Sequence, residues 1–168
     1  MPTSNPVEIM LAHDHWATRN IIEACAALTA EQFHHRFDMG PGSLHDTTTH
    51  ILAAMRVWGD LLAGREQRPR LEGSTRSTTE LLALLDELSA DLLASARTYP
   101  LDETVTRQRR DGVTLLLSRG GVITHVATHG MHHRAQCLNM FRQLGVTPLP
   151  KSSVVEWMTT ADVNRSVQ

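Results

Sequence analysis

The chain has 168 residues, with 16 basic against 18 acidic side chains and a net charge of −2. This length suits one domain, so we expect residues 1–168 to form a single domain with its own hydrophobic core. The sequence contains neither a basic tract nor an apolar run of roughly 20 residues, so neither nucleic-acid binding nor membrane insertion is expected. The N-terminus does not resemble a secretory signal, and Cys25 and Cys137 lie in apolar helical patterns. Both observations favour a cytoplasmic protein with reduced, buried thiols.

Two helices are predicted in the first third of the chain. Apolar residues recur at helical spacing over residues 7–28, and a Gly-Pro-Gly segment then interrupts the pattern. The second helix is predicted over residues 43–64. Ser43 is suited to cap it, Asp46 stands at the offset of a capping-box acid, and Gly64 is suited to end it.

The next segment is predicted to contain a loop, a helix and a short connector. Residues 65–76 are polar and include Pro and Gly, which favours a loop. The third helix is predicted over residues 77–99, because Ser77 and Glu80 form a capping-box pattern ahead of a leucine-rich face. Residues 101–118 place β-branched side chains around an Asp-Gly pair, which predicts an extended or hairpin-like connector.

The fourth helix is predicted over residues 119–144, with Gly145 at its end, and a short last helix within residues 152–163. Four helices of roughly 20 residues with little sheet predict an all-α four-helix bundle with a short extra C-terminal helix. In such a bundle, residues near the middle of each helix converge on a shared interior.

The segment THVATHGMHHRAQ contains four of the ten histidines in the chain. On a helix that turns about 100° per residue, His125 and His133 lie about 40° to either side of His129. Gln136 and His132 fall on the same face. Histidines four residues apart present their imidazoles one turn apart, the spacing that helical zinc sites use. The pattern therefore predicts a metal site that includes His129 and His133.

A catalytic zinc site needs a third protein ligand, which must come from another helix. His50 is the best candidate, because it lies in the middle of the second helix among apolar and small residues. His13 and His15 on the first helix remain alternatives. Three other histidines are expected to face solvent: His34, His35 and His45.

Two other metal architectures do not fit the sequence. A di-iron carboxylate bundle needs Glu-x-x-His on two helices, and this pattern occurs once, from Glu31 to His34. The HExxH motif of metalloproteases is absent.

The histidine in LHDTTTHILAA, followed by THVATHGMHHRAQ near the end of a four-helix chain, resembles the DinB-like family of metal-binding four-helix proteins. The opening LAHDHWATRNIIEACAAL is similar to the first helix of that family, and the resemblance covers residues 7–144. It implies an up-down-down-up bundle, often a homodimer. It also implies that His50, His129 and His133 are the metal ligands.

Characterised relatives in that family use low-molecular-weight thiols such as bacillithiol or mycothiol, so the resemblance implies a thiol-dependent transferase acting on a small-molecule substrate. Three neutral imidazoles leave a bound divalent cation its full charge, which activates a coordinated thiol or water.

Zinc is the expected ion and nickel the alternative. Gln136 is expected to orient substrate, and His125 to contribute a hydrogen bond or a pocket wall. A metal-dependent hydrolase and a non-catalytic protein with a structural metal are the competing hypotheses.

Overall fold

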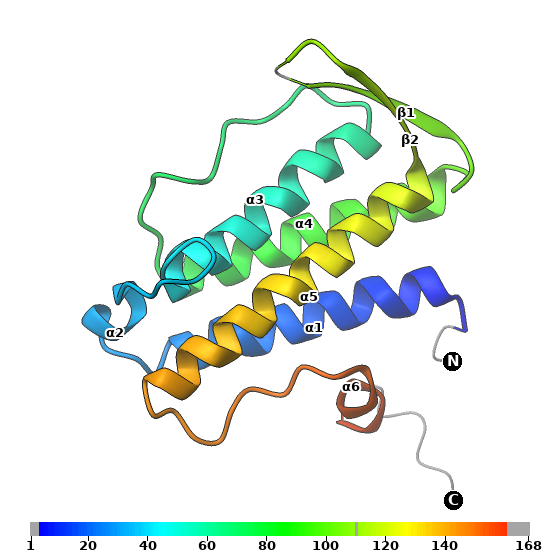
Figure 1. The fold of residues 1–168 in the computed structure, drawn as a ribbon. Helices are drawn as coiled ribbons and strands as arrows, with labels where there is room; N and C mark the ends of the chain where they lie inside the picture. The colour runs from blue at the N-terminus through cyan, green and yellow to red at the C-terminus, as the bar shows by residue number, and fades with distance from the viewer. Residues whose placement is uncertain (1–3, 110, 161–168) are drawn as a thin grey trace, which may run out of the picture.

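The computed structural model describes residues 4–109 and 111–160. The described residues form six helices and two strands: α1 (Pro6–Cys25), α2 (Ala30–His34), α3 (Leu44–Leu62), α4 (Thr78–Thr98), β1 (Thr104–Gln108), β2 (Thr114–Ser118), α5 (Arg119–Gln143) and α6 (Val154–Thr160). The four long helices α1, α3, α4 and α5 pack into a bundle (Figure 1).

The direction of the helices confirms the up-down-down-up arrangement. Helices α1 and α5 run one way, and α3 and α4 run the other (Figure 1). Helices α3 and α5 lie side by side and antiparallel, so that His50 meets His133 while Trp58 meets His125 further along. Because α3 and α4 are parallel, the chain must return along the bundle between them, and the polar segment predicted as a loop makes this connection.

Side-chain caps start the helices where the sequence predicts. The Ser77 hydroxyl accepts a hydrogen bond from the backbone N–H of Glu80, and the Glu80 carboxylate accepts one from the backbone N–H of Ser77. This capping box confirms the predicted start of α4. Ser118 caps α5 by accepting from Gly121, which completes the short passage from β2 into that helix.

The role predicted for Asp46 is wrong in part. The Ser43 hydroxyl does accept from the backbone N–H of Asp46 and caps α3. The Asp46 carboxylate does not return to the cap. It accepts instead from Arg36 at 2.6 Å and from Nδ1 of His45 at 2.9 Å, because both donors lie beside the first turn of α3.

Three other elements refine the prediction. Helix α1 ends at Cys25, and the separate helix α2 follows, started by a capping box of Thr29 and Gln32. The predicted connector is an antiparallel hairpin in which Thr104 pairs with Ser118. The extra C-terminal helix is present as α6, and the last three residues of its predicted range lie outside the described residues.

One hydrophobic core fills the space between the long helices. Its fully buried side chains come from all four of them, and include Ile21, Ile51, Leu85 and Phe141. Cys25 and Cys137 lie in this core as free thiols, as predicted. Among the described residues, no helix has the length and hydropathy required to cross a bilayer.

Candidate metal centre

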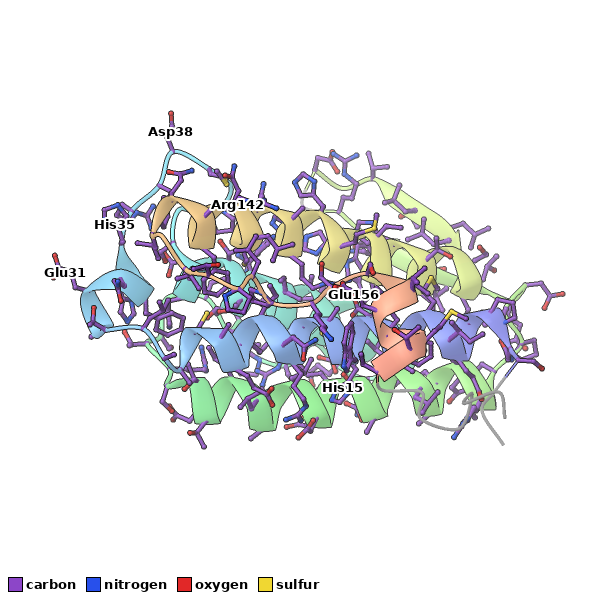
Figure 2. All side chains as sticks on the ribbon, turned by 90° about the horizontal axis from the view of Figure 1, so that it is seen from below. His15, Glu31, His35, Asp38, Arg142 and Glu156 are labelled. Atoms are coloured by element: carbon purple, nitrogen blue, oxygen red, sulfur yellow. The ribbon has the colours of Figure 1, made fainter. Side chains whose placement is uncertain are left out.

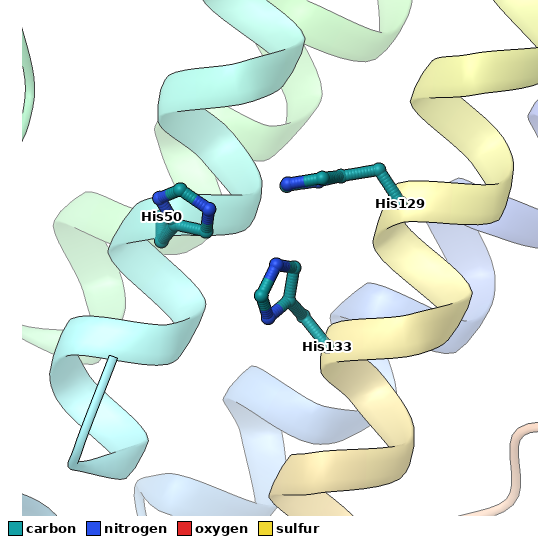
Figure 3. A group of neighbouring side chains, drawn as sticks. All are labelled: His50, His129 and His133. Atoms are coloured by element: carbon teal, nitrogen blue, oxygen red, sulfur yellow. The ribbon is translucent and has the colours of Figure 1, made fainter. Parts of the chain in front are cut away.

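Three imidazoles converge between α3 and α5. His50 projects from α3, and His129 and His133 project from successive turns of α5 toward it (Figure 3). Each ring offers one nitrogen, and these three atoms lie within 4.8 Å of one another. The ring centroids are separated by 4.4 Å between His129 and His133 and by 4.7 Å between His50 and His133. We call these three residues the histidine triad.

The environment of His129 and His133 favours neutral imidazoles. Burial, reinforced by the neighbouring histidines His133 and His50, lowers the pKa of His129 to about 4. Burial also lowers the pKa of His133, although its hydrogen bond to Gln136 acts in the opposite direction. Neutral imidazole is the form that binds a metal, because the protonated ring has no free lone pair.

Polar side chains lie beside two of the three rings. Nδ1 of His133 lies 2.8 Å from the side-chain oxygen of Gln136, and Nδ1 of His50 lies 3.7 Å from a carboxylate oxygen of Glu72. The contact of His133 is a hydrogen bond, and such bonds fix the tautomer of a metal-binding histidine and raise its basicity, whereas the carboxylate of Glu72 lies beyond hydrogen-bond distance of His50. An amide oxygen only accepts, so Nδ1 of His133 carries the proton and Nε2 keeps its lone pair.

The donor set fits a divalent transition metal. Three neutral imidazoles are suitable ligands for zinc or nickel, and no carboxylate belongs to the cluster. Nδ1 of His129 is buried and makes no hydrogen bond to any described residue, which leaves this ring free of a competing partner. The side chain of His50 is 36% exposed, so the triad is open to solvent on one side.

The two predicted catalytic residues lie beside the triad. Gln136 is engaged with two imidazoles, since its amide nitrogen lies 3.2 Å from Nε2 of His132 while its oxygen contacts His133. His125 is exposed, and its ring contacts His129 and Trp58 at centroid distances of 5.7 and 5.0 Å. Both positions suit residues that shape the site, and their catalytic roles stay predictions.

The alternative ligands on α1 lie away from the triad. A ring nitrogen of His13 contacts the backbone oxygen of Ser152 at 2.9 Å, and His15 contacts the carboxylate of Asp86 at 2.8 Å. The contact of His13 holds α1 to the C-terminal segment, and the contact of His15 holds α1 to α4. Figure 2 labels His15 on the side of α1 that faces α4. Two further histidines are exposed as predicted, His34 and His35.

The prediction that His45 faces solvent is wrong. Its side chain is buried, because α2 and the loop before α4 cover the first turn of α3. The ring packs against Phe33 and His34, and its Nε2 accepts a hydrogen bond from the backbone N–H of Arg76. Since Nε2 accepts, Nδ1 must carry the proton that is donated to Asp46, so His45 is a structural histidine.

Arg134, next to His133, forms a buried ion pair. Its guanidinium donates to the Asp14 carboxylate and, at 3.0 Å, to the Thr18 hydroxyl. Asp14 and Arg134 are 2% and 3% exposed, so the pair ties α1 to α5 inside the bundle. The ion pair therefore gives Arg134 a structural role.

Sequence analysis missed two neighbours of the site, Glu72 and Trp58. Glu72 lies in the loop before α4, where no periodic pattern indicates its direction. Trp58 follows His50 by eight residues on α3, which places it about two turns further along and about 80° around the helix, at the flank of the face that carries His50.

Comparison with known proteins supports the fold and identifies the family. A crystal structure of YjoA, a DinB-like protein from Bacillus subtilis, has the same fold with a TM-score of 0.57 at 16% identity; the match covers 86% of this chain and 96% of that one. Among proteins with curated descriptions, none matches the sequence significantly. The model of the DinB family matches residues 1–162. The chain therefore belongs to the DinB family.

Proposed function

We propose that the protein is a metal-dependent transferase that activates a low-molecular-weight thiol for attack on a small electrophile. The observation that carries this proposal is the histidine triad, in which His50, His129 and His133 place three nitrogen donors within 4.8 Å of one another. We propose zinc as the ion, with nickel as the alternative. A divalent cation held by neutral ligands supplies its full charge to a coordinated thiol, which then loses its proton at neutral pH.

The thiol must come from outside the chain. The sequence has two cysteines, Cys25 and Cys137, and they are 2% and 0% exposed. Burial raises the pKa of Cys137 to about 12 and holds that of Cys25 well above its ordinary value. Neither thiol reaches the triad as a nucleophile, because the thiolate is the reactive form and both sulfurs face the core.

The chain's own residues would position the reactants. Gln136 holds the ring of His133, and the edge of the triad beside His50 is exposed, so the thiol and the electrophile would approach from that side. In the reaction, the thiol sulfur forms a bond to the electrophilic carbon, the leaving group departs with its bonding electrons, and the thiol proton passes to solvent. His125 lies at the rim, where it can contact either reactant.

The test incubates zinc-loaded protein with an electrophilic aryl halide and a panel of thiols that includes bacillithiol, mycothiol and cysteine. We expect a thioether product by mass spectrometry in the presence of one or more thiols, and none with His50→Ala. A double variant with Cys25→Ala and Cys137→Ala serves as the matched control and should keep the activity. Consumption of an ester substrate without any thiol would favour a hydrolase, and no turnover with any substrate would favour a structural metal.

We further propose that the protein acts as a homodimer in the cytoplasm and takes small molecules, with no nucleic-acid or membrane partner. The homodimer is proposed from membership of the family. Large apolar side chains exposed on the surface, such as Leu116 and Val155, offer a physical means of association.

A further inference from the structure

A cationic cavity lies where the hairpin meets α3. Arg107 on β1 places its guanidinium 3.9 Å from the centre of the Trp58 ring. The cavity beside this pair has a volume of about 410 Å³, and Leu115, which pairs with Arg107 across the hairpin, also lines it. A cation held over an indole face is positioned by packing, so its remaining N–H donors are available to a ligand.

The described side chains that line this cavity include more positive than negative charges. Arg109 is paired with Asp111 at 2.9 Å, and both line the cavity. Arg107 forms no ion pair with any described residue. The described lining therefore carries one net positive charge, located on a guanidinium that burial partly desolvates and whose pKa burial lowers. A partly buried cation without an acidic partner is costly unless an anion accompanies it.

A continuous row of rings joins this cavity to the histidine triad. The ring of Trp58 contacts that of His125 with a centroid distance of 5.0 Å, and His125 contacts His129 at 5.7 Å. The row follows the antiparallel pair α3 and α5. Trp58 follows His50 by eight residues on α3, which is about 12 Å along the helix axis. A ligand extended from the triad along this row would have to span roughly that length to meet Arg107.

We propose that Arg107 and Trp58 form a subsite for a carboxylate carried at the far end of the thiol whose sulfur lies at the histidine triad. This inference rests on the proposed function and names a substrate class for it. The guanidinium binds the carboxylate through two parallel N–H donors, and the indole face fixes the guanidinium plane. A carboxylate carries one negative charge and so matches the one guanidinium of the described lining that has no acidic partner.

The experiment compares matched thiols that differ only in their terminal group. Zinc-loaded protein is titrated by calorimetry with ω-mercaptoalkanoates and with ω-mercaptoalkanols of the same length, having three, six and eight carbons. We expect the eight-carbon acid to bind about tenfold more tightly than the alcohol, and the three-carbon pair to bind equally, because only the longer chain reaches Arg107. An ω-mercaptoalkyl phosphate of the longest length forms a third arm and should gain less than the acid.

Variants of Arg107 separate recognition from folding. Arg107→Gln should abolish the preference for the acid while the alcohol binds as before, and Arg107→Lys should retain part of it. Arg142→Gln, an exposed arginine at the end of α5, is the matched control and should keep the full preference.

Equal binding of acid and alcohol at every length would overturn the subsite and leave the proposed function standing. No heat of binding with any thiol would instead contradict the proposed function, and tighter binding of the phosphate would overturn the choice of a carboxylate.

Discussion

Gly40 and the side chain of Gln136 lie in close contact across the gap between the α2–α3 loop and α5. A Cβ atom on Gly40 would be 2.2 Å from the same Gln136 oxygen that contacts His133. The backbone at Gly40 has φ of +50°, a conformation that disfavours other residues. The loop before α3 therefore leaves room for the amide that orients a candidate metal ligand.

Gly40→Ala should weaken zinc binding without unfolding the protein. The added methyl group displaces the flexible Gln136 side chain, and His133 loses its hydrogen bond; loss of such a contact costs about 10–100-fold in metal affinity. Competition with a chromophoric chelator measures the affinity. Gly64→Ala is the control, because Gly64 also has a positive φ (+63°) and a Cβ there would meet nothing within 4 Å. Equal zinc affinity in the two variants would show that Gln136 does not support the site.

His50→Ala should remove zinc binding and its stabilising effect. The change leaves two histidines on one helix, which hold zinc far more weakly than three from two helices. At a zinc concentration about a hundred times the Kd, wild type should gain about 5–10 °C in Tm, and the variant should gain nothing measurable. Elemental analysis of protein prepared without a nickel column gives the metal content. His35→Ala, an exposed histidine in the loop after α2, should behave as wild type, and full zinc content in His50→Ala would exclude His50 as a ligand.

Metal-free protein should lose stability as the pH falls from about 6.5 to about 4. The folded-state pKa of His129 is depressed to about 4 from an ordinary 6.5. In this range the unfolded chain binds a proton that the folded chain does not, so the free energy of unfolding falls, and the loss levels off below pH 4. Urea denaturation at several pH values measures it. His129→Gln should reduce the loss in this window without removing it, because burial also lowers the pKa of His13 and of His133. An unchanged profile would mean that His129 does not contribute.

Asp14→Ala should destabilise the bundle by about 3–5 kcal/mol, because it leaves the buried guanidinium of Arg134 without its partner. Replacing both residues with apolar ones, Asp14→Leu with Arg134→Met, should recover much of that loss. Arg109→Gln breaks the exposed pair with Asp111 and should cost no more than about 1 kcal/mol. Denaturant titration of the metal-free protein measures the free energy of unfolding of the Asp14 variant, the double variant and the Arg109 variant. If the Asp14 variant lost as little as the Arg109 variant, the buried pair would contribute little to stability.

The protein should behave as a homodimer at micromolar concentration. Light scattering should give twice the chain mass of 18.7 kDa. A single-chain mass at every concentration up to about 100 µM would reject the dimer, and it would leave the histidine triad unaffected, because all three residues come from one chain.

Sequence determined the helices and the spacing of two candidate ligands. Apolar periodicity predicted all four long helices, and the capping residues Ser43 and Ser77 marked two starts correctly. His129 and His133 lie one turn apart on any α-helix, since that spacing depends only on local backbone geometry. The short helix α2 was missed, although Thr29 and Gln32 carry its capping-box signature.

The sequence favoured His50 over His45 as the histidine that meets α5, but only the tertiary structure showed where His45 lies. His45 and His50 are five residues apart, which places them about 140° apart around the helix. Packing of the apolar residues turns His50 toward His129 and buries His45 beneath α2 and the loop at Arg76. Such contacts join residues far apart in the chain, and they depend on how whole helix faces bury apolar surface together, which no local periodicity encodes.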